Sequence, residues 1–257
     1  MELGRRLSLG IGAASVLAGL SAWYALRAFH LVSPDLLASP QEVVAAFLDI
    51  VRNGYRETTL SQNIVATLGR CLIGFGAAVL LGVPLGLWMG MSRLTAASID
   101  YIIQFLRPLP PLSYLVLLIL WFGTGDLSKI MLLFMGAFPT ITSAAMSGVR
   151  QVSEQRIQAA RALGASSRQI FRHVVFPSAL AEIFTGARLA IGFVYGTLIA
   201  AEIIAGSSGI GWMIVDAGRF LRSDYVFVGI FIIGLMGIAL DRLLLVIERR
   251  AVHWAGK

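Results

Sequence analysis

Long apolar runs without a charged side chain recur along the whole chain, and they constrain its fold more than any other feature. A helix needs about 20 mainly apolar residues to cross the hydrocarbon core of a bilayer. One buried helix of a soluble protein can look similar, but several such runs in a chain of 257 residues indicate a membrane protein. The uncharged runs are Leu7–Leu26, Cys71–Ser92, Pro108–Gly125, Ile130–Val149, Leu189–Ala201 and Tyr225–Leu240.

These runs predict an all-α, polytopic membrane protein that forms a single transmembrane domain over residues 1–257. We expect about six transmembrane helices, at residues 7–28, 66–91, 101–122, 128–149, 180–204 and 225–246. The composition agrees, since 14% of the residues are charged, whereas a typical soluble domain has about 25%.

The basic residues indicate which ends of the helices face the cytoplasm. Cytoplasmic loops of membrane proteins carry an excess of Lys and Arg. Such residues gather before the first run, in the segment 150–178 and in the C-terminal tail: Arg5, Arg6, Arg150, Arg156, Arg161, Arg168, Arg172, Arg249, Arg250 and Lys257. We therefore expect both termini and the segment 150–178 in the cytoplasm, and we attribute the net charge of +7 to topology rather than to nucleic-acid binding.

Two local patterns predict further detail. Ser39-Pro40 followed by Glu42 is typical of a capped helix start, and it predicts a short amphipathic helix to about Val51 on the outer face. The second run has a small residue at every fourth position, namely Gly74, Ala78, Gly82, Gly86 and Gly90. This strip permits close approach of another helix, either within the subunit or at a dimer seam.

The segment 150–178 is polar and regular. Ser153 is a candidate N-cap for a helix to Leu163, and Gly164 suits the left-handed position that ends a helix. Ser166 and Gln169 have the spacing of a capping box that begins a second helix. Pro177 marks where that helix ends or bends into the fifth span. The segment therefore predicts a compact helix-turn-helix on the inner surface.

The same segment resembles the conserved loop of the permeases of binding-protein-dependent ABC importers, in which Glu-Ala-Ala precedes a Gly and then Ile-x-Leu-Pro. Ala159, Ala160, Gly164 and Pro177 match in register, and Val174 and Phe176 replace the Ile and Leu. Gln158 stands in place of the acidic residue, so a salt bridge made by that carboxylate is lost.

Other stretches resemble the nitrate, sulfonate and taurine group of these permeases, and the taurine permeases most of all. The resemblance is carried by Trp121-Phe122-Gly123-x-Gly125, Ser128-Lys129, Leu163-Gly164-Ala165-Ser166, Ala200-Ala201-Glu202, Gly209-Ile210-Gly211, Phe220-Leu221-x-x-Asp224 and Arg107-Pro108-x-Pro110-Pro111-Leu112.

The resemblance implies a type I ABC importer permease in a bacterial inner membrane. Its partners would be a second copy, two cytoplasmic ATPases that bind ATP and Mg, and a periplasmic or lipid-anchored binding protein. The cargo would be taurine or another alkanesulfonate, with nitrate, bicarbonate or a pyrimidine precursor as alternatives. An ion-coupled secondary transporter is the rival class. The residues implied in ATPase coupling are Arg156, Gln158, Ala159, Ala160, Arg161, Gly164, Ser166, Arg168 and Pro177.

The chain itself lacks the motifs of an enzyme. It contains no Gly-x4-Gly-Lys-Ser/Thr loop, no Gly-x-Ser-x-Gly elbow and no His-Glu-x-x-His. We therefore expect no catalytic site, metal site or cofactor on this chain. The candidate residues of a translocation pathway are Arg107, Pro108, Pro110 and Pro111, where a regular helix cannot continue, and Glu202, an acid within a span.

Overall fold

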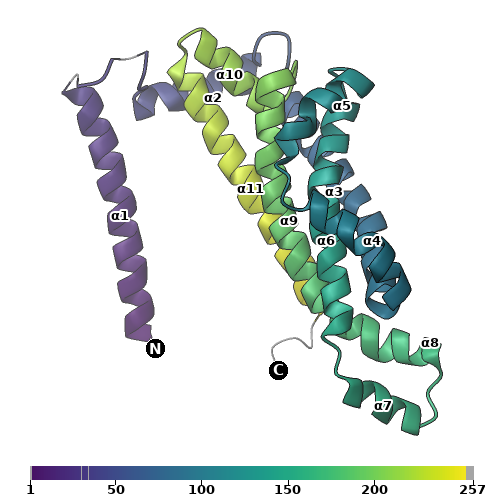
Figure 1. Ribbon diagram of the computed structural model, residues 1–257. Coiled ribbons are helices and arrows are strands. Elements are labelled where there is room, and N and C mark those ends of the chain that lie inside the picture. Colours follow the sequence, from purple (N-terminus) through teal and green to yellow (C-terminus); the bar gives the residue numbers. More distant parts are fainter. Residues whose placement is uncertain (1, 30, 34, 253–257) are drawn as a thin grey trace. The chain divides into compact units, whose positions relative to one another are not determined.

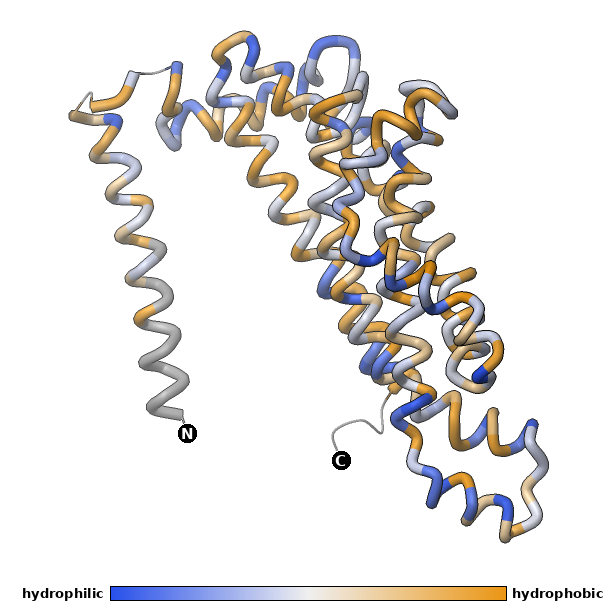
Figure 2. The backbone as a smooth tube through the Cα atoms, in the orientation of Figure 1, coloured by the Kyte–Doolittle hydropathy of each residue, from blue (hydrophilic) through white to orange (hydrophobic). Residues whose placement is uncertain are grey.

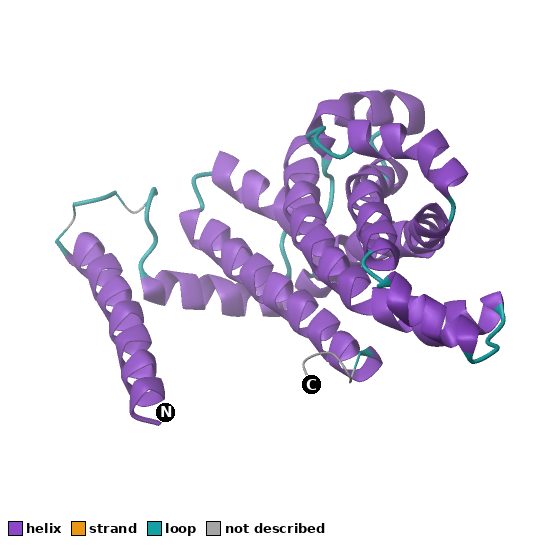
Figure 3. Ribbon diagram, turned by 60° about the horizontal axis from the view of Figure 1, so that its bottom comes forward, coloured by secondary structure: helices purple, strands orange, loops and turns teal. Residues whose placement is uncertain are grey.

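Nearly all of the described chain is helical (Figure 3). The computed structural model describes residues 2–29, 31–33 and 35–252, without the side chains of residues 2–10, 12, 13 and 16. Within these ranges the only extended pairing is an isolated bridge between Tyr55 and Thr58. The elements are α1 (Glu2–Ala28), α2 (Pro40–Asn53), α3 (Leu60–Met91), α4 (Arg93–Leu106), the 3-10 helix η1 (Pro111–Tyr114), α5 (Leu115–Phe122), α6 (Asp126–Arg150), α7 (Glu154–Ala162), α8 (Ser167–Ile170), the π-helix η2 (Phe171–Val175), α9 (Phe176–Ala205), α10 (Ile210–Arg219) and α11 (Ser223–Ala251).

Four helices are long and apolar enough to cross a membrane, and a bent pair provides a fifth span if it is counted as one. The four are Leu60–Met91, Asp126–Arg150, Ser167–Ala205 and Ser223–Ala251. They overlap the second, fourth, fifth and sixth expected spans. The first expected span, residues 7–28, falls in α1, where several side chains lie outside the described part. Over the described residues, α1 is not among the helices that are long and apolar enough to cross a membrane.

The expected third span, residues 101–122, is not one helix. α4 ends at Leu106, and η1 with α5 begins at Pro111, with a bend of 91° between the two halves. Proline has no amide hydrogen and its ring clashes with the preceding turn, so Pro108, Pro110 and Pro111 interrupt the helical ladder. The break therefore lies in the middle of the apolar stretch rather than at its entry.

The chain divides into two compact units. One unit comprises residues 1–63 and 213–232, and the other comprises residues 64–212 and 233–257. The prediction of a single transmembrane domain stays a prediction.

Close helix packing builds the larger unit, and the small-residue strip of α3 makes it possible. A Cβ added at Gly74 would lie 2.7 Å from the Leu133 Cβ, and one at Gly82 would lie 3.0 Å from the Thr142 Oγ1. α6 packs in turn against α9, where a Cβ on Gly148 would lie 2.9 Å from the Ala179 carbonyl oxygen. The strip therefore serves packing within the subunit, which is the first of the two alternatives.

α6 and α9 run alongside each other, and α7 and α8 extend from their shared end (Figure 1). Apolar residues dominate the long helices, whereas hydrophilic and apolar residues alternate along α7 and α8 (Figure 2). The polar character of α7 is consistent with its complete lack of buried residues. This short helical pair is therefore built for an aqueous surface.

In the smaller unit, α2 begins with a hydrogen-bonded cap and has one buried face. The Glu42 amide donates to the Ser39 Oγ at 3.3 Å, and the Ser39 amide donates to the Glu42 Oε2 at 2.6 Å, so the expected capping box is present. Val43, Ala46 and Ile50 form the buried face of α2. The amphipathic helix predicted from Ser39 is thereby confirmed, and its assignment to the outer face stays a prediction.

Candidate functional site

The segment between α6 and α9 has the predicted helix-turn-helix form. α7 ends at Ala162, and Gly164 follows with a φ of 82°, a conformation that glycine adopts without a steric penalty. The Gly164 amide donates to the Arg161 carbonyl at 2.9 Å, and the Ala165 amide donates to the Ala160 carbonyl at 3.0 Å. These bonds close the end of α7, and the predicted conformation of Gly164 is confirmed.

The two predicted caps differ. At α8 the Ser166 amide donates to the Gln169 Oε1 at 2.8 Å, and the Gln169 amide donates to the Ser166 Oγ at 3.4 Å, which confirms the capping box. Ser153 does occupy the N-cap of α7, but its side chain accepts no capping bond. Its extended backbone, with φ −63° and ψ 136°, suits a cap. Only the hydroxyl departs from the prediction.

Pro177 does not end the second helix. The π-helix η2 carries α8 directly into α9, so Ser167–Ala205 forms one helix of 39 residues. Pro177 lies in the first turn of α9, and the wider turns of η2 precede it. A π-helical turn is a local deformation that often marks a functional position in a helix. The predicted bend into the fifth span therefore takes the form of this turn.

The predicted coupling residues share this segment but face different ways. Ala160 packs, half-buried, against the cluster that contains Val152 and Ile170, and Pro177 is half-buried at the start of α9. The other predicted coupling residues are exposed: Arg156, Gln158, Ala159, Arg161, Gly164, Ser166 and Arg168. They present small, basic and amide groups at the surface.

Leu163 lies in the same segment but is not among the predicted coupling residues. Its side chain is 89% exposed, at the turn between α7 and α8. An apolar side chain on a polar segment, directly before the glycine that ends the helix, was an available signal. Such an exposed leucine suits contact with another protein, although a single one is common on surfaces.

The pathway candidates do not form one group. Arg107 follows α4 and is exposed, as are Pro108 and Pro110, whereas Pro111 is buried. A Cβ at Gly136 of α6 would lie 3.1 Å from the Pro111 ring, so the break packs on α6. The Glu202 carboxylate accepts hydrogen bonds from Thr67, Arg70 and Gly211, none of which is a pathway candidate.

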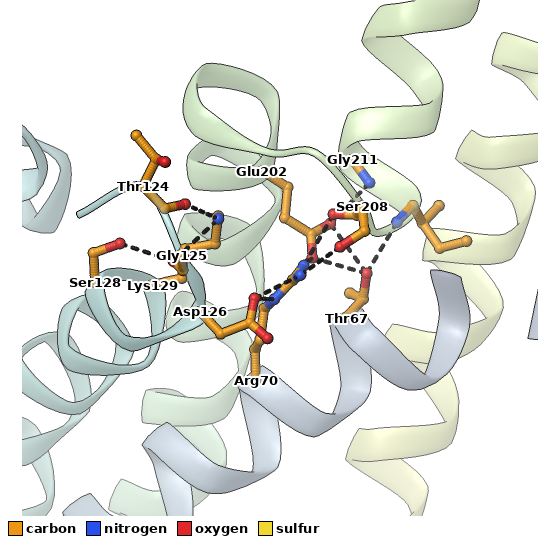
Figure 4. Close-up of polar contacts among 11 residues, drawn as sticks. Thr67, Arg70, Thr124, Gly125, Asp126, Ser128, Lys129, Glu202, Ser208 and Gly211 are labelled. Atoms are coloured by element: carbon orange, nitrogen blue, oxygen red, sulfur yellow. Dashed lines mark hydrogen bonds and ion pairs between the residues drawn. The ribbon is translucent and has the colours of Figure 1, made fainter. Parts of the chain in front are cut away.

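Glu202 belongs to a buried network of charged and polar groups (Figure 4). Its side chain is fully buried, and the Arg70 Nη1 lies 2.6 Å from its Oε1. The Thr67 hydroxyl donates to the carboxylate at 2.9 and 3.0 Å, and the Gly211 amide donates to its Oε2 at 2.9 Å. This carboxylate therefore has the partners that a buried charge requires.

Arg70 joins three parts of the chain to this network. Its Nε donates to the Asp126 Oδ1 at 2.8 Å, at the start of α6. Its Nη1 and Nη2 donate to the Ser208 carbonyl at 3.0 Å and to the Ser208 hydroxyl at 2.7 Å. Arg70 thus ties α3 to α6, α9 and the loop after α9. Its signal in the sequence was a charge inside an expected span, which by default marks a functional or structural role.

The glycines after α9 permit this network. Gly209 has a φ of 109°, and a Cβ there would collide with the Glu202 carboxylate. A Cβ on Gly211 would lie 2.8 Å from the Ile199 carbonyl oxygen. Lys129 is also buried, and its ammonium donates to the carbonyls of Thr124 at 2.9 Å and Gly125 at 3.3 Å (Figure 4). The Gly209-Ile210-Gly211 stretch therefore lets the loop cover the buried acid.

The long apolar helices define a multi-pass membrane protein, and the exposed helix-turn-helix between α6 and α9 is its distinguishing feature. The chain matches the family described as binding-protein-dependent transport system inner membrane component over residues 82–253, and it belongs to that family.

Curated relatives agree with this assignment. The taurine transport system permease protein TauC of Escherichia coli is 40% identical over 99% of this chain and 92% of its own. The putative aliphatic sulfonates transport permease protein SsuC of Bacillus subtilis is 32% identical over 91% of this chain and 84% of its own. The nitrate import permease protein NrtB of Synechocystis is 31% identical over 84% of this chain and 80% of its own.

The fold has counterparts in solved transporters. The inward-facing MetNI methionine ABC transporter matches with a TM-score of 0.60 at 22% identity, over 75% of this chain and 95% of that one. An amino acid ABC transporter matches with a TM-score of 0.60 at 19% identity, over 82% of this chain and 96% of that one. The predicted fold class, that of a type I ABC importer permease, is confirmed.

Proposed function

We propose that this chain is the translocation subunit of an ATP-driven importer of taurine or a related alkanesulfonate. The observation that carries the transport role is the exposed α7–α8 segment, whose Gly164 turn lies in register with the family pattern. The relative that is 40% identical and named for taurine transport supports the substrate. Nitrate is the second candidate, because a nitrate import permease is 31% identical.

The proposed assembly contains a second copy of this chain, two cytoplasmic ATPases that bind ATP and Mg, and a binding protein outside. Both termini and the segment 150–178 lie in the cytoplasm of the cell that carries it, in accordance with the arginine distribution. The terminal residues 253–257 lie outside the described residues. Labelling of a cysteine introduced at Gln158 in intact cells tests this orientation, and efficient labelling from outside contradicts it.

Connectivity explains how α7 and α8 would transmit force. α7 follows α6 after a short link, and α8 continues through η2 into α9. α6 and α9 pack backbone to backbone, with a Cβ on Gly148 placed 3.0 Å from the Ala179 Cα. A partner that pushes this segment therefore moves two closely packed helices together. At its other end, α9 is fixed by Glu202 to Arg70, so its motion reaches α3.

The substrate is tested by uptake into proteoliposomes that contain the chain, its ATPase and its binding protein. We expect ATP-dependent accumulation of radiolabelled taurine, which excess unlabelled ethanesulfonate reduces and excess nitrate does not. Accumulation of nitrate without taurine would replace the substrate and leave the permease class. ATP-independent uptake driven by an ion gradient would contradict the transport class itself.

A further inference from the structure

Two connectors of the smaller unit hold unusual backbone conformations. Arg56, between α2 and α3, has a φ of 52°, and Leu221, between α10 and α11, has a φ of 56°. They are the only non-glycine residues with a positive φ in the described part of the chain. Such conformations cost free energy and often occur where a binding site fixes the backbone. Their two connectors contribute residues to one surface of the smaller unit.

That surface contains a pocket of about 480 Å³. We call it the aromatic–arginine pocket, and it is lined by Asp49, Gly54, Tyr55, Arg56, Phe220, Arg222 and Tyr225. All of these residues belong to the smaller unit. The pocket is open and its walls mix aromatic rings with charged groups of both signs.

Two guanidinium groups lie over aromatic rings in this pocket. The Arg56 Cζ lies 4.5 Å from the Phe220 ring centroid, and the Arg222 Cζ lies 4.1 Å from the Tyr225 ring centroid. Stacking of this kind stabilises a cation and limits its motion. A planar guanidinium that is fixed in this way presents its donors to an oxyanion with little loss of side-chain entropy.

Carboxylates hold one edge of each guanidinium. The Arg56 Nε donates to Asp216, and the Arg222 Nε and Nη2 donate to Asp224 at 3.0 and 2.8 Å. The Asp224 carboxylate engages Nε and Nη2, so the Nη1 of Arg222 lies outside this ion pair. Arg222 thus retains a donor that can face a ligand.

Asp49 adds a negative group to the same pocket. It accepts a hydrogen bond from the Tyr225 hydroxyl and one from the Asn53 amide at 2.7 Å. These hydrogen bonds lower the pKa of the Asp49 carboxyl, so it is ionised at neutral pH. Asp49, Asp216 and Asp224 together offset the two arginines. A plain anion therefore meets no net positive field here, whereas a ligand with charges of both signs finds a partner for each.

We propose that the aromatic–arginine pocket binds a zwitterionic aminosulfonate, with the sulfonate at Arg222 and Arg56 and the ammonium at Asp49. The ligand class rests on the proposed function, which it deepens by adding a site on the permease itself. This site on the permease would be distinct from the substrate site of the binding protein. A sulfonate offers several acceptors to guanidinium donors, and the ammonium pairs with a carboxylate.

The test measures direct binding of radiolabelled taurine, up to millimolar concentrations, to the permease–ATPase complex in nanodiscs without its binding protein. We expect saturable binding that ethanesulfonate and ethanolamine, each with only one of the two charges, displace at least tenfold less well than taurine. Arg222→Gln should weaken taurine binding at least tenfold. Arg219→Gln, which removes an exposed arginine three residues away that does not line the pocket, should not.

A second variant separates ligand binding from a merely structural effect. Asp49→Asn keeps an acceptor for the Tyr225 hydroxyl but removes the charge, so it should weaken taurine binding and leave ethanesulfonate binding unchanged or stronger. Absence of saturable taurine binding, or equal binding by Arg222→Gln and the unmodified complex, overturns the proposal. So does a loss confined to association with the binding protein, which would make the pocket a docking surface. Uptake of taurine by the complete importer distinguishes these failures from a wrong substrate.

Discussion

Arg70 Nη1 lies 2.6 Å from the Glu202 Oε1, and both side chains are buried, at 4% and 0% exposure. The pair joins α3 to the C-terminal part of α9 across 132 positions of sequence. Removing one partner of a buried ion pair leaves the other charged and unpaired, which typically costs about 3–5 kcal/mol.

Glu202→Gln should therefore lower the free energy of unfolding by up to about 3–5 kcal/mol, because Arg70 then keeps only Asp126, whose side chain is 65% exposed, as a charged partner. Thermal unfolding of the purified protein in detergent measures the effect. Asp241→Asn is the control, since Asp241 pairs with Arg188 at 3.0 Å but is half exposed, and exposed pairs contribute at most about 1 kcal/mol. Equal shifts for the two variants would contradict a structural role for the buried pair.

The α3 strip allows a paired test of helix packing. A Cβ at Gly86 would collide with the Thr142 carbonyl oxygen and lie 3.1 Å from the Met146 amide nitrogen, whereas one at Gly76 meets nothing within 4 Å. Gly86→Val should therefore destabilise the protein by about 1–3 kcal/mol or prevent folding, while Gly76→Val should not. The yield of monodisperse protein and its melting temperature report the difference. A stable Gly86→Val protein would show that α3 and α6 do not pack as described.

Leu163 should matter for assembly and not for folding. Because it is 89% exposed, Leu163→Ser should change the free energy of unfolding by no more than about 0.5 kcal/mol. If the α7–α8 turn enters a partner surface, the same variant should reduce copurification of the ATPase several-fold, and Leu163→Met should retain it. Full copurification with Leu163→Ser would remove this residue from the interface.

Sequence reasoning succeeded where the determinants are local. The Ser166–Gln169 and Ser39–Glu42 boxes and the Gly164 turn each depend on a few neighbouring residues, and all three are present. The apolar runs likewise predicted the all-α membrane fold, because span length is a local property. The proline run showed that a helix must break, and its position within the span became clear only from the course of α4 and α5.

The buried network could not be assembled from the sequence. Glu202 stands out in the sequence as an acid within an expected span, but no spacing rule selects Arg70 as its partner, and the partners of Arg70 lie at positions 126, 202 and 208. The same holds for the aromatic–arginine pocket, which joins Arg56 to residues of the α10–α11 connector. Contacts between distant segments depend on how helices pack, which a single sequence does not encode as a pattern.

Two glycines provide the most direct test of whether the α7–α8 turn couples ATP hydrolysis to transport. Gly164 and Gly123 have φ values of 82° and 78°, and an added Cβ at either meets nothing within 4 Å. Valine therefore imposes similar backbone strain at both, of about 1 kcal/mol or more. The measurement is association of the ATPase with each variant, together with ATP-driven taurine uptake in proteoliposomes. We predict that Gly164→Val inserts normally but loses ATPase association and uptake, whereas Gly123→Val keeps ATPase association. Normal association and uptake with Gly164→Val would contradict coupling through this turn.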